Sequence, residues 1–138
     1  MKAENLRVKY LDPKDYSTYT DEASGENINL ILMSGIRKII KNKKFSYTID
    51  MEACNSMTVK GKDGFHIIIK CTATDPKGKV VETYASASPL TTSSNYTVEM
   101  AEKRSISRAI LMLADMYDSY KGADEFSSTP KSLKLPIK

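Results

Sequence analysis

Apolar and polar residues alternate along three segments in the middle of the chain, which is the period of a β-strand with one buried face. From Tyr47 to Val59 the apolar residues fall on odd positions, and we expect a bulge near Asn55. Odd positions are again apolar or small in residues 65–73 and 80–87. Turn sequences separate the three segments. We therefore predict a three-stranded antiparallel sheet whose odd positions all face the core.

Two further segments have the spacing of helices. In residues 26–42 apolar side chains recur at intervals of three and four, although Gly35 weakens this helix slightly. A second helix is predicted over residues 96–120. Residues 6–10 alternate weakly and predict a short, optional strand, while residues 12–25 have the composition of a loop. The predicted fold is α+β in the order (β)αβββα, with both helices on one face of the sheet and the other face open.

The length and composition of the chain place it among single-domain proteins. Its 138 residues are 41% hydrophobic, which is enough for one sizeable core. We expect one nucleic-acid-binding domain over residues 1–126 and a flexible basic tail over residues 127–138. No apolar run approaches the ~20 residues of a membrane span, and the first residues lack the apolar core of a signal peptide. These features predict a soluble, cytoplasmic protein with no membrane partner.

Cysteine and histidine content gives little sign of a metal or cofactor site. Cys54 and Cys71 are predicted to lie on opposite faces of adjacent strands, so both are expected to be free thiols. The single histidine, His66, cannot form a cluster of metal ligands. Gly61 and Gly64 belong to a turn and do not form a phosphate-binding glycine loop. We predict no metal, no cofactor and no dependence on ATP.

One catalytic assignment can be weighed against the sequence. A helix, three strands and a helix also form the core of PD-(D/E)xK nucleases, whose carboxylates hold a catalytic magnesium ion. Asp50, Glu52 and Asp63 are candidate carboxylates, with Lys70 as the lysine. However, Ile68 stands two residues before this lysine, where the nuclease needs a metal ligand. The sequence therefore predicts a protein that is not an enzyme.

The positive charges are clustered, which makes a polyanionic partner plausible. The net charge is +4, and five positive charges fall within residues 37–44. Neutralising phosphates releases counterions and drives association. The alternative is structural: basic residues also complement helix C-termini, hydrate turns or form ion pairs. The candidate nucleic-acid contacts are Arg37, Lys38, Lys41, Lys43, Lys44, Lys60, Lys62, Lys70, Lys103, Arg104 and Arg108, with Tyr84 for base stacking.

The most informative motif lies in the last predicted helix. Residues 101–110 read A-E-x-R-x-I-x-R-A-I, with Arg104 and Arg108 one turn apart, and the acidic residues Asp124 and Glu125 follow the helix. This pattern resembles the helix that closes the core of phage-type single-strand annealing proteins of the Erf and Sak-like groups. The resemblance implies a three-stranded sheet followed by a long helix, binding of single-stranded DNA along a basic groove, assembly into rings or filaments, and annealing without ATP. The chain departs from the family at residues 115–117, where a glycine is usual.

We therefore expect an ATP-independent protein that binds single-stranded DNA, forms a homo-oligomer and acts in recombination or replication, with annealing of strands as a further activity. Two other functions fit the same pattern. A double-stranded-RNA-binding module has the same order of elements, but Glu99 and Glu102 stand where it needs lysines. A protein-interaction or assembly protein would use the open sheet face and Tyr84, with its charge serving solubility.

Overall fold

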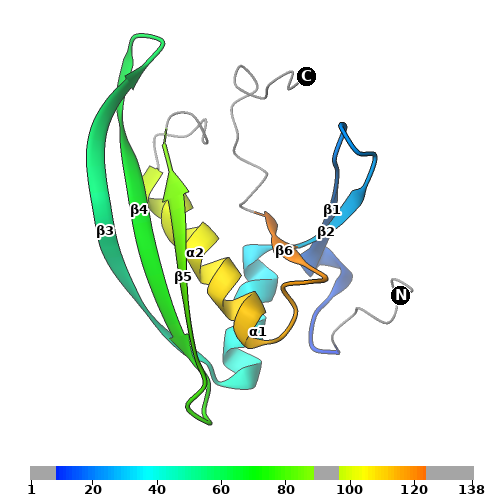
Figure 1. Cartoon of the computed structure of the whole chain (residues 1–138). Coiled ribbons are helices and arrows are strands. Elements are labelled where there is room, and N and C mark those ends of the chain that lie inside the picture. The colour runs from blue at the N-terminus through cyan, green and yellow to red at the C-terminus, as the bar shows by residue number, and fades with distance from the viewer. Residues whose placement is uncertain (1–8, 89–96, 124–138) are drawn as a thin grey trace.

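The computed structural model describes residues 9–88 and 97–123, which form an α+β fold (Figure 1). Within these residues there are two helices and two three-stranded sheets. The elements, after a short 3₁₀ helix at Pro13–Asp15, are β1 (Tyr16–Thr20), β2 (Asn27–Ile31), α1 (Met33–Lys43), β3 (Ser46–Val59), β4 (Lys62–Thr74), β5 (Val80–Ala87), α2 (Thr97–Leu113) and β6 (Lys121–Gly122).

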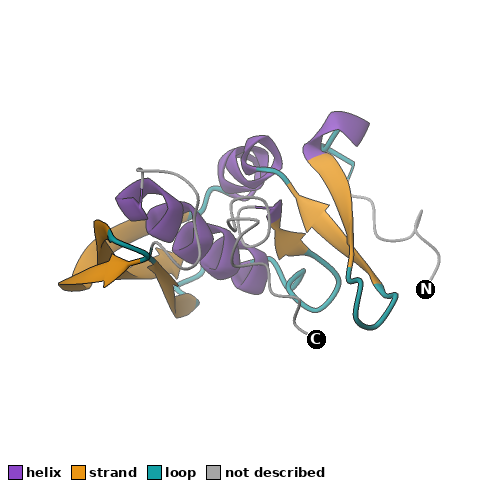
Figure 2. Cartoon of the chain, turned by 90° about the horizontal axis from the view of Figure 1, so that it is seen from above, coloured by secondary structure: helices purple, strands orange, loops and turns teal. Residues whose placement is uncertain are grey.

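The larger sheet has the strand order β3-β4-β5 and is antiparallel throughout, as predicted. Helix α2 packs on one of its faces, and no described element covers the other face (Figure 1). Viewed from above, both helices lie between the larger sheet and the smaller one (Figure 2). Helix α2 is therefore buried on two sides, against β4 and β5 on one and against β6 on the other.

Small side chains allow α2 to lie close to the sheet. Ala101, Ser105 and Ala109 are fully buried. The Thr83 hydroxyl of β5 donates a hydrogen bond to the Ser105 carbonyl at 2.7 Å, which fixes the helix against the strand. On the opposite side of the helix, a Cβ atom on Gly122 would lie 2.5 Å from Cβ of Ser107, so β6 needs glycine there.

The register of the β3–β4 hairpin corrects the predicted pattern of faces. Pairs run in phase as far as Met51 opposite Ile69, but Ala53 then pairs with Ile68, so Glu52 is the extra residue of a bulge. Beyond the bulge the even positions share the face of α2, and Cys54 lies opposite Ile67. The prediction that odd positions face inward along all of this strand is therefore wrong beyond the bulge, and so is the outward placement of Cys54.

The hairpin turn is also shorter than predicted. Lys60 and Gly61 form a two-residue turn, with φ angles of 52° and 80°. Positive φ at both central positions matches the right-handed twist of the flanking strands. Cys54 is exposed and Cys71 is buried, and both are free, as predicted. Burial raises the pKa of the Cys71 thiol to about 11.

The N-terminal third differs most from the prediction. Strand β1 lies within the segment predicted as a loop, and the predicted helix over residues 26–42 begins only at Met33. Residues 27–31 form β2 instead, which pairs antiparallel with β1 over its whole length and parallel with Lys121 and Gly122 of β6. Of the predicted strand at residues 6–10, only the last two residues are described, and they lie in a turn. The predicted tail at residues 127–138 lies outside the described residues.

Helix α2 ends at Leu113, earlier than the predicted helix. Asp115 has a φ of 59°, the left-handed conformation in which glycine is usual after a helix. Its N–H donates to Met112 O at 3.1 Å, and the N–H of Met116 donates to Leu111 O at 2.8 Å. These two bonds form a Schellman motif, so Asp115 takes the conformation that glycine provides in other chains.

A buried carboxylate fixes α1 to the preceding 3₁₀ helix. Asp15 is fully buried and accepts hydrogen bonds from Lys38 Nζ at 2.7 Å, from Ser34 Oγ at 2.7 Å and from the Asp12 N–H at 2.9 Å. Burial alone would raise the pKa of this carboxyl group, but these bonds outweigh it and lower the pKa to about 2. Gly35 allows α1 to lie close to the end of β2, since a Cβ atom on residue 35 would lie 2.6 Å from Cγ2 of Ile31.

We predict that Gly35→Ala destabilises the protein by about 1–3 kcal/mol, because overpacking against the buried Ile31 outweighs the better helix propensity of alanine. Urea unfolding followed by circular dichroism measures the change. The matched control is Asn42→Ala on the exposed side of α1, which should change stability by less than about 0.7 kcal/mol. Equal effects of the two substitutions would contradict the packing argument.

We predict that the free energy of unfolding decreases at acidic pH because the Asp15 carboxylate becomes protonated. Its native pKa of about 2 lies below the ordinary value of ~3.9, so the ionised group stabilises the fold fully above about pH 4, and this contribution is lost as the pH falls towards 2. Asp15→Asn should cost about 1.5–3 kcal/mol at pH 7 and flatten the decline in unfolding free energy between pH 4 and 2. Asp12→Asn, at an exposed partner of the same lysine, should keep the decline. If Asp15→Asn shows the same decline in unfolding free energy as the wild-type protein, Asp15 is not the group responsible.

Candidate functional site

A groove of about 320 Å³ runs between α1, α2 and the first half of β3. It forms because α2 packs on β4 and β5 and leaves the same face of β3 partly uncovered. Tyr47 and Met51 on that face are 42% and 51% exposed. The groove is lined by Met33, Arg37, Ile40, Tyr47, Ile49, Glu99, Glu102, Lys103 and Ile106.

One side of the groove, formed by α1, is basic. Arg37 lines it, Lys41 follows one turn later, and Lys43 and Lys44 stand at the end of the helix. All four side chains are exposed, and within the described part of the chain none of them forms an ion pair. Lys38 differs, because it pairs with Asp12 and Asp15 and serves the fold. The predicted basic cluster is therefore divided between one structural lysine and four available cations.

The opposite side of the groove, formed by α2, carries both signs of charge. Glu99, Glu102 and Lys103 line it from the first turns of the helix. Glu99 and Lys103 are one turn apart, which is the spacing at which opposite charges support a helix. The floor between the two sides is apolar, since Ile40, Ile49 and Ile106 line it. Of the predicted contacts, the structure thus brings Arg37 and Lys103 to one groove.

Lys70 and Tyr84 lie on the other face of the sheet. Lys70 pairs with Glu52 at 3.5 Å and with Glu82 at 3.8 Å, while Asp50 and Tyr84 are its direct neighbours across the strands. The hydrogen bond with Glu52 and the charges of both glutamates raise the pKa of Lys70. The two glutamates and the neighbouring Asp50 outnumber this one cation, so the region is acidic. The ion pairs argue against a phosphate contact at Lys70, and Tyr84, although 54% exposed, is remote from the basic helix.

The two arginines of the α2 motif hold the edge of the sheet. Arg104 is only 4% exposed, and its Nη1 donates to the Ser86 carbonyl at 3.1 Å, while Nη1 of Arg108 donates to the Tyr84 carbonyl at 2.7 Å. Four residues of helix rise about 6.0 Å and two residues of strand about 6.6 Å, so the arginines match alternate carbonyls of β5. The structure therefore gives both of these predicted phosphate contacts a role in the fold, since they satisfy carbonyls of an edge strand.

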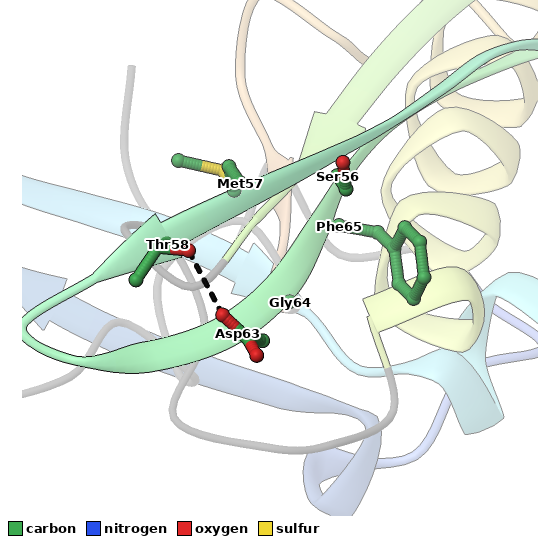
Figure 3. A pocket seen from close by; sticks show the side chains of 6 residues that line it. All are labelled: Ser56, Met57, Thr58, Asp63, Gly64 and Phe65. Carbon is green, nitrogen blue, oxygen red and sulfur yellow. Dashed lines mark hydrogen bonds between the residues drawn. The ribbon is translucent and has the colours of Figure 1, made fainter.

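The remaining predicted lysines lie at the tip of the β3–β4 hairpin. Lys60 is exposed in the turn, at the end of the sheet far from the C-terminus of α1 (Figure 1). Only the backbone of Lys62, in β4, is described. A second hollow, of about 500 Å³, lies near this tip, where Phe65 points towards α2 and the Thr58 hydroxyl donates to Asp63 at 2.9 Å (Figure 3).

The acidic residues weighed for a nuclease lie apart. Asp63 is near the hairpin tip, whereas Asp50 lies opposite Lys70 on the neighbouring strand, in the middle of the sheet. Among residues 9–88 and 97–123 there is no group of three or more His, Cys, Asp or Glu side chains placed to hold a metal ion.

Over the same residues, none of the helices has the length and apolar character needed to cross a bilayer.

Sequence reasoning missed Tyr47 as a surface residue. It assigned this side chain to the core by strand alternation, which gives the face of a strand but not how far a helix covers it. The signal that could have found it is its position, three residues after a run of basic residues at the start of a strand.

Comparison of the chain with models of protein families finds no match, and comparison with curated proteins finds none either.

We predict that Arg104→Ala destabilises the protein by about 1.5–3 kcal/mol, because it removes a charged donor and leaves the Ser86 carbonyl of the edge strand without it. The control is Lys103→Ala at the neighbouring position, which forms no ion pair in the described chain and should change stability by less than about 0.5 kcal/mol. Urea unfolding measures both. A loss of DNA binding with no loss of stability in Arg104→Ala would contradict the structural role.

Proposed function

We propose that this protein binds single-stranded DNA, without ATP, along the basic side of α1 and the adjoining groove. The proposal is carried by one observation: four exposed cations without ion pairs in the described chain stand beside a partly exposed apolar floor. Cations bind the phosphate backbone, and an apolar or aromatic surface next to them suits unpaired bases. A duplex presents its phosphates outside and its bases stacked inside, so it would leave this floor unused.

The resemblance of residues 101–110 to annealing proteins supports extending the proposal to strand annealing in recombination or replication, carried out by a homo-oligomer. In that extended proposal the arginines of the motif stabilise the domain, and the DNA contacts come from α1, which precedes the sheet. An annealing assay with two complementary labelled strands tests this extension separately from binding.

A protein partner is the second candidate, because one face of the larger sheet is uncovered. That face presents Tyr84 beside the ion pairs of Lys70, which is a mixed polar and aromatic surface. Double-stranded RNA is less well supported, since Glu99 and Glu102 occupy the start of α2 where that module needs cations. Both alternatives predict that single-stranded DNA competes poorly.

We predict that the triple variant Arg37→Ala, Lys41→Ala, Lys44→Ala binds single-stranded DNA at least about tenfold more weakly at 0.1 M salt. The slope of log affinity against log salt should fall by about 2, since each phosphate contact to a single strand contributes about 0.7. Fluorescence anisotropy of a labelled oligonucleotide over a salt series measures both quantities.

The matched control is the triple variant Lys9→Ala, Lys14→Ala, Lys77→Ala, which removes the same charge from exposed positions outside the groove. It should keep the wild-type slope within about 0.5. If both variants lose affinity equally, the effect is one of net charge and the proposed site is wrong. Better competition by duplex RNA than by single-stranded DNA would favour the RNA-binding alternative.

A further inference from the structure

We propose that bases of the bound strand enter the groove and that Tyr47 is the platform on which one of them stacks. This inference rests on the proposed function and concerns how the same site holds its ligand. It predicts a site that distinguishes a strand with bases from a bare phosphate chain.

Tyr47 is exposed enough to contact a base. The side chain stands at the start of β3 and lines the groove together with Ile40 and Ile49, yet 42% of its surface is exposed. A tyrosine ring has a flat π-face and few rotatable bonds, so it can accept a stacked base at little entropic cost. The ring is open because α2 packs on β4 and β5, whereas Tyr47 belongs to the uncovered strand β3.

The difference in charge between the two sides of the groove orients the bound strand. The α1 side carries Arg37, with the lysines of its C-terminal end beyond it, whereas the α2 side carries Glu99 and Glu102 with one cation, Lys103. Phosphates are attracted to the first side and repelled by the carboxylates of the second. A strand lying along α1 therefore turns its bases towards the floor and towards α2.

The carboxylates of the groove favour some bases over others. Glu99 and Glu102 are acceptors only, so they can pair with the exocyclic amino groups of cytosine, adenine and guanine. Thymine has no amino group, and the single donor on its pairing edge, N3–H, lies between two carbonyl oxygens that a carboxylate repels. The groove, at the small end of the range for ligand sites, suits a short stretch of single strand.

Three unlabelled competitors of equal length test this: oligo(dC), oligo(dT) and a chain of abasic deoxyribose phosphates. We expect the wild-type protein to bind oligo(dC) at least about fivefold more tightly than the abasic chain, since one stacked base is worth about 1–3 kcal/mol. It should also bind oligo(dC) more tightly than oligo(dT). In Tyr47→Ala the advantage of oligo(dC) over the abasic chain should fall to less than about twofold, with the salt slope unchanged.

Two variants keep the test decisive. Tyr47→Phe keeps the aromatic face and should retain the wild-type advantage, while Tyr84→Ala changes a tyrosine on the other face that is at least as exposed and should have no effect. The double variant Glu99→Ala, Glu102→Ala should bring oligo(dC) and oligo(dT) to the same affinity. Circular dichroism confirms that each variant is folded.

The outcomes separate this inference from the proposed function. If the wild-type protein binds the abasic chain as tightly as oligo(dC), bases do not enter the groove and the inference is wrong, while DNA binding through phosphates stands. If oligo(dC) keeps its advantage in folded Tyr47→Ala, the platform lies elsewhere and the inference is again wrong. If none of the three chains binds, the proposed function itself fails.

Discussion

The close packing of α2 between two sheets is the constraint on which the rest of the structure depends. Ala101, Ser105 and Ala109 let the helix approach β4 and β5, and the glycine of β6 lets the second sheet approach its other side. Arg104 and Arg108 then fix the helix along β5 by bonding alternate carbonyls of that edge strand. A helix held this close to one edge of a three-stranded sheet leaves the strand at the opposite edge partly uncovered, and that is where the groove forms.

The same packing divides the positive charges into those the fold uses and those it leaves available. Lys38, Lys70 and Lys79 pair with carboxylates, and the α2 arginines bond to carbonyls. Lys121 lies 3.5 Å from the centre of the Tyr117 ring. The exposed cations of α1 form no ion pair in the described chain, so they stay available on one side of the groove.

Local patterns in the sequence predicted the larger sheet and α2, because alternation and helical spacing each act over a few residues. Three features could not be predicted in this way. The smaller sheet combines the local hairpin of β1 and β2 with a pairing of β2 to β6, whose residues lie about 90 positions later. The bulge at Glu52 changes which side chains of β3 share the face of α2. The arginine pair has the spacing that phosphate recognition also uses, and only the position of β5 shows that its partners are backbone carbonyls. For the site, Arg37 and Lys103 were predicted by charge, whereas Tyr47 was assigned to the core.

An NMR titration of the isotope-labelled protein with a single-stranded oligonucleotide would locate the DNA-binding surface residue by residue. We expect chemical-shift changes concentrated on residues 37–47 and on the first turns of α2, with little change at Lys70 and Tyr84 on the other face of the sheet. Changes concentrated on that other face, or no changes at low salt, would contradict the claim that α1 and the groove bind single-stranded DNA.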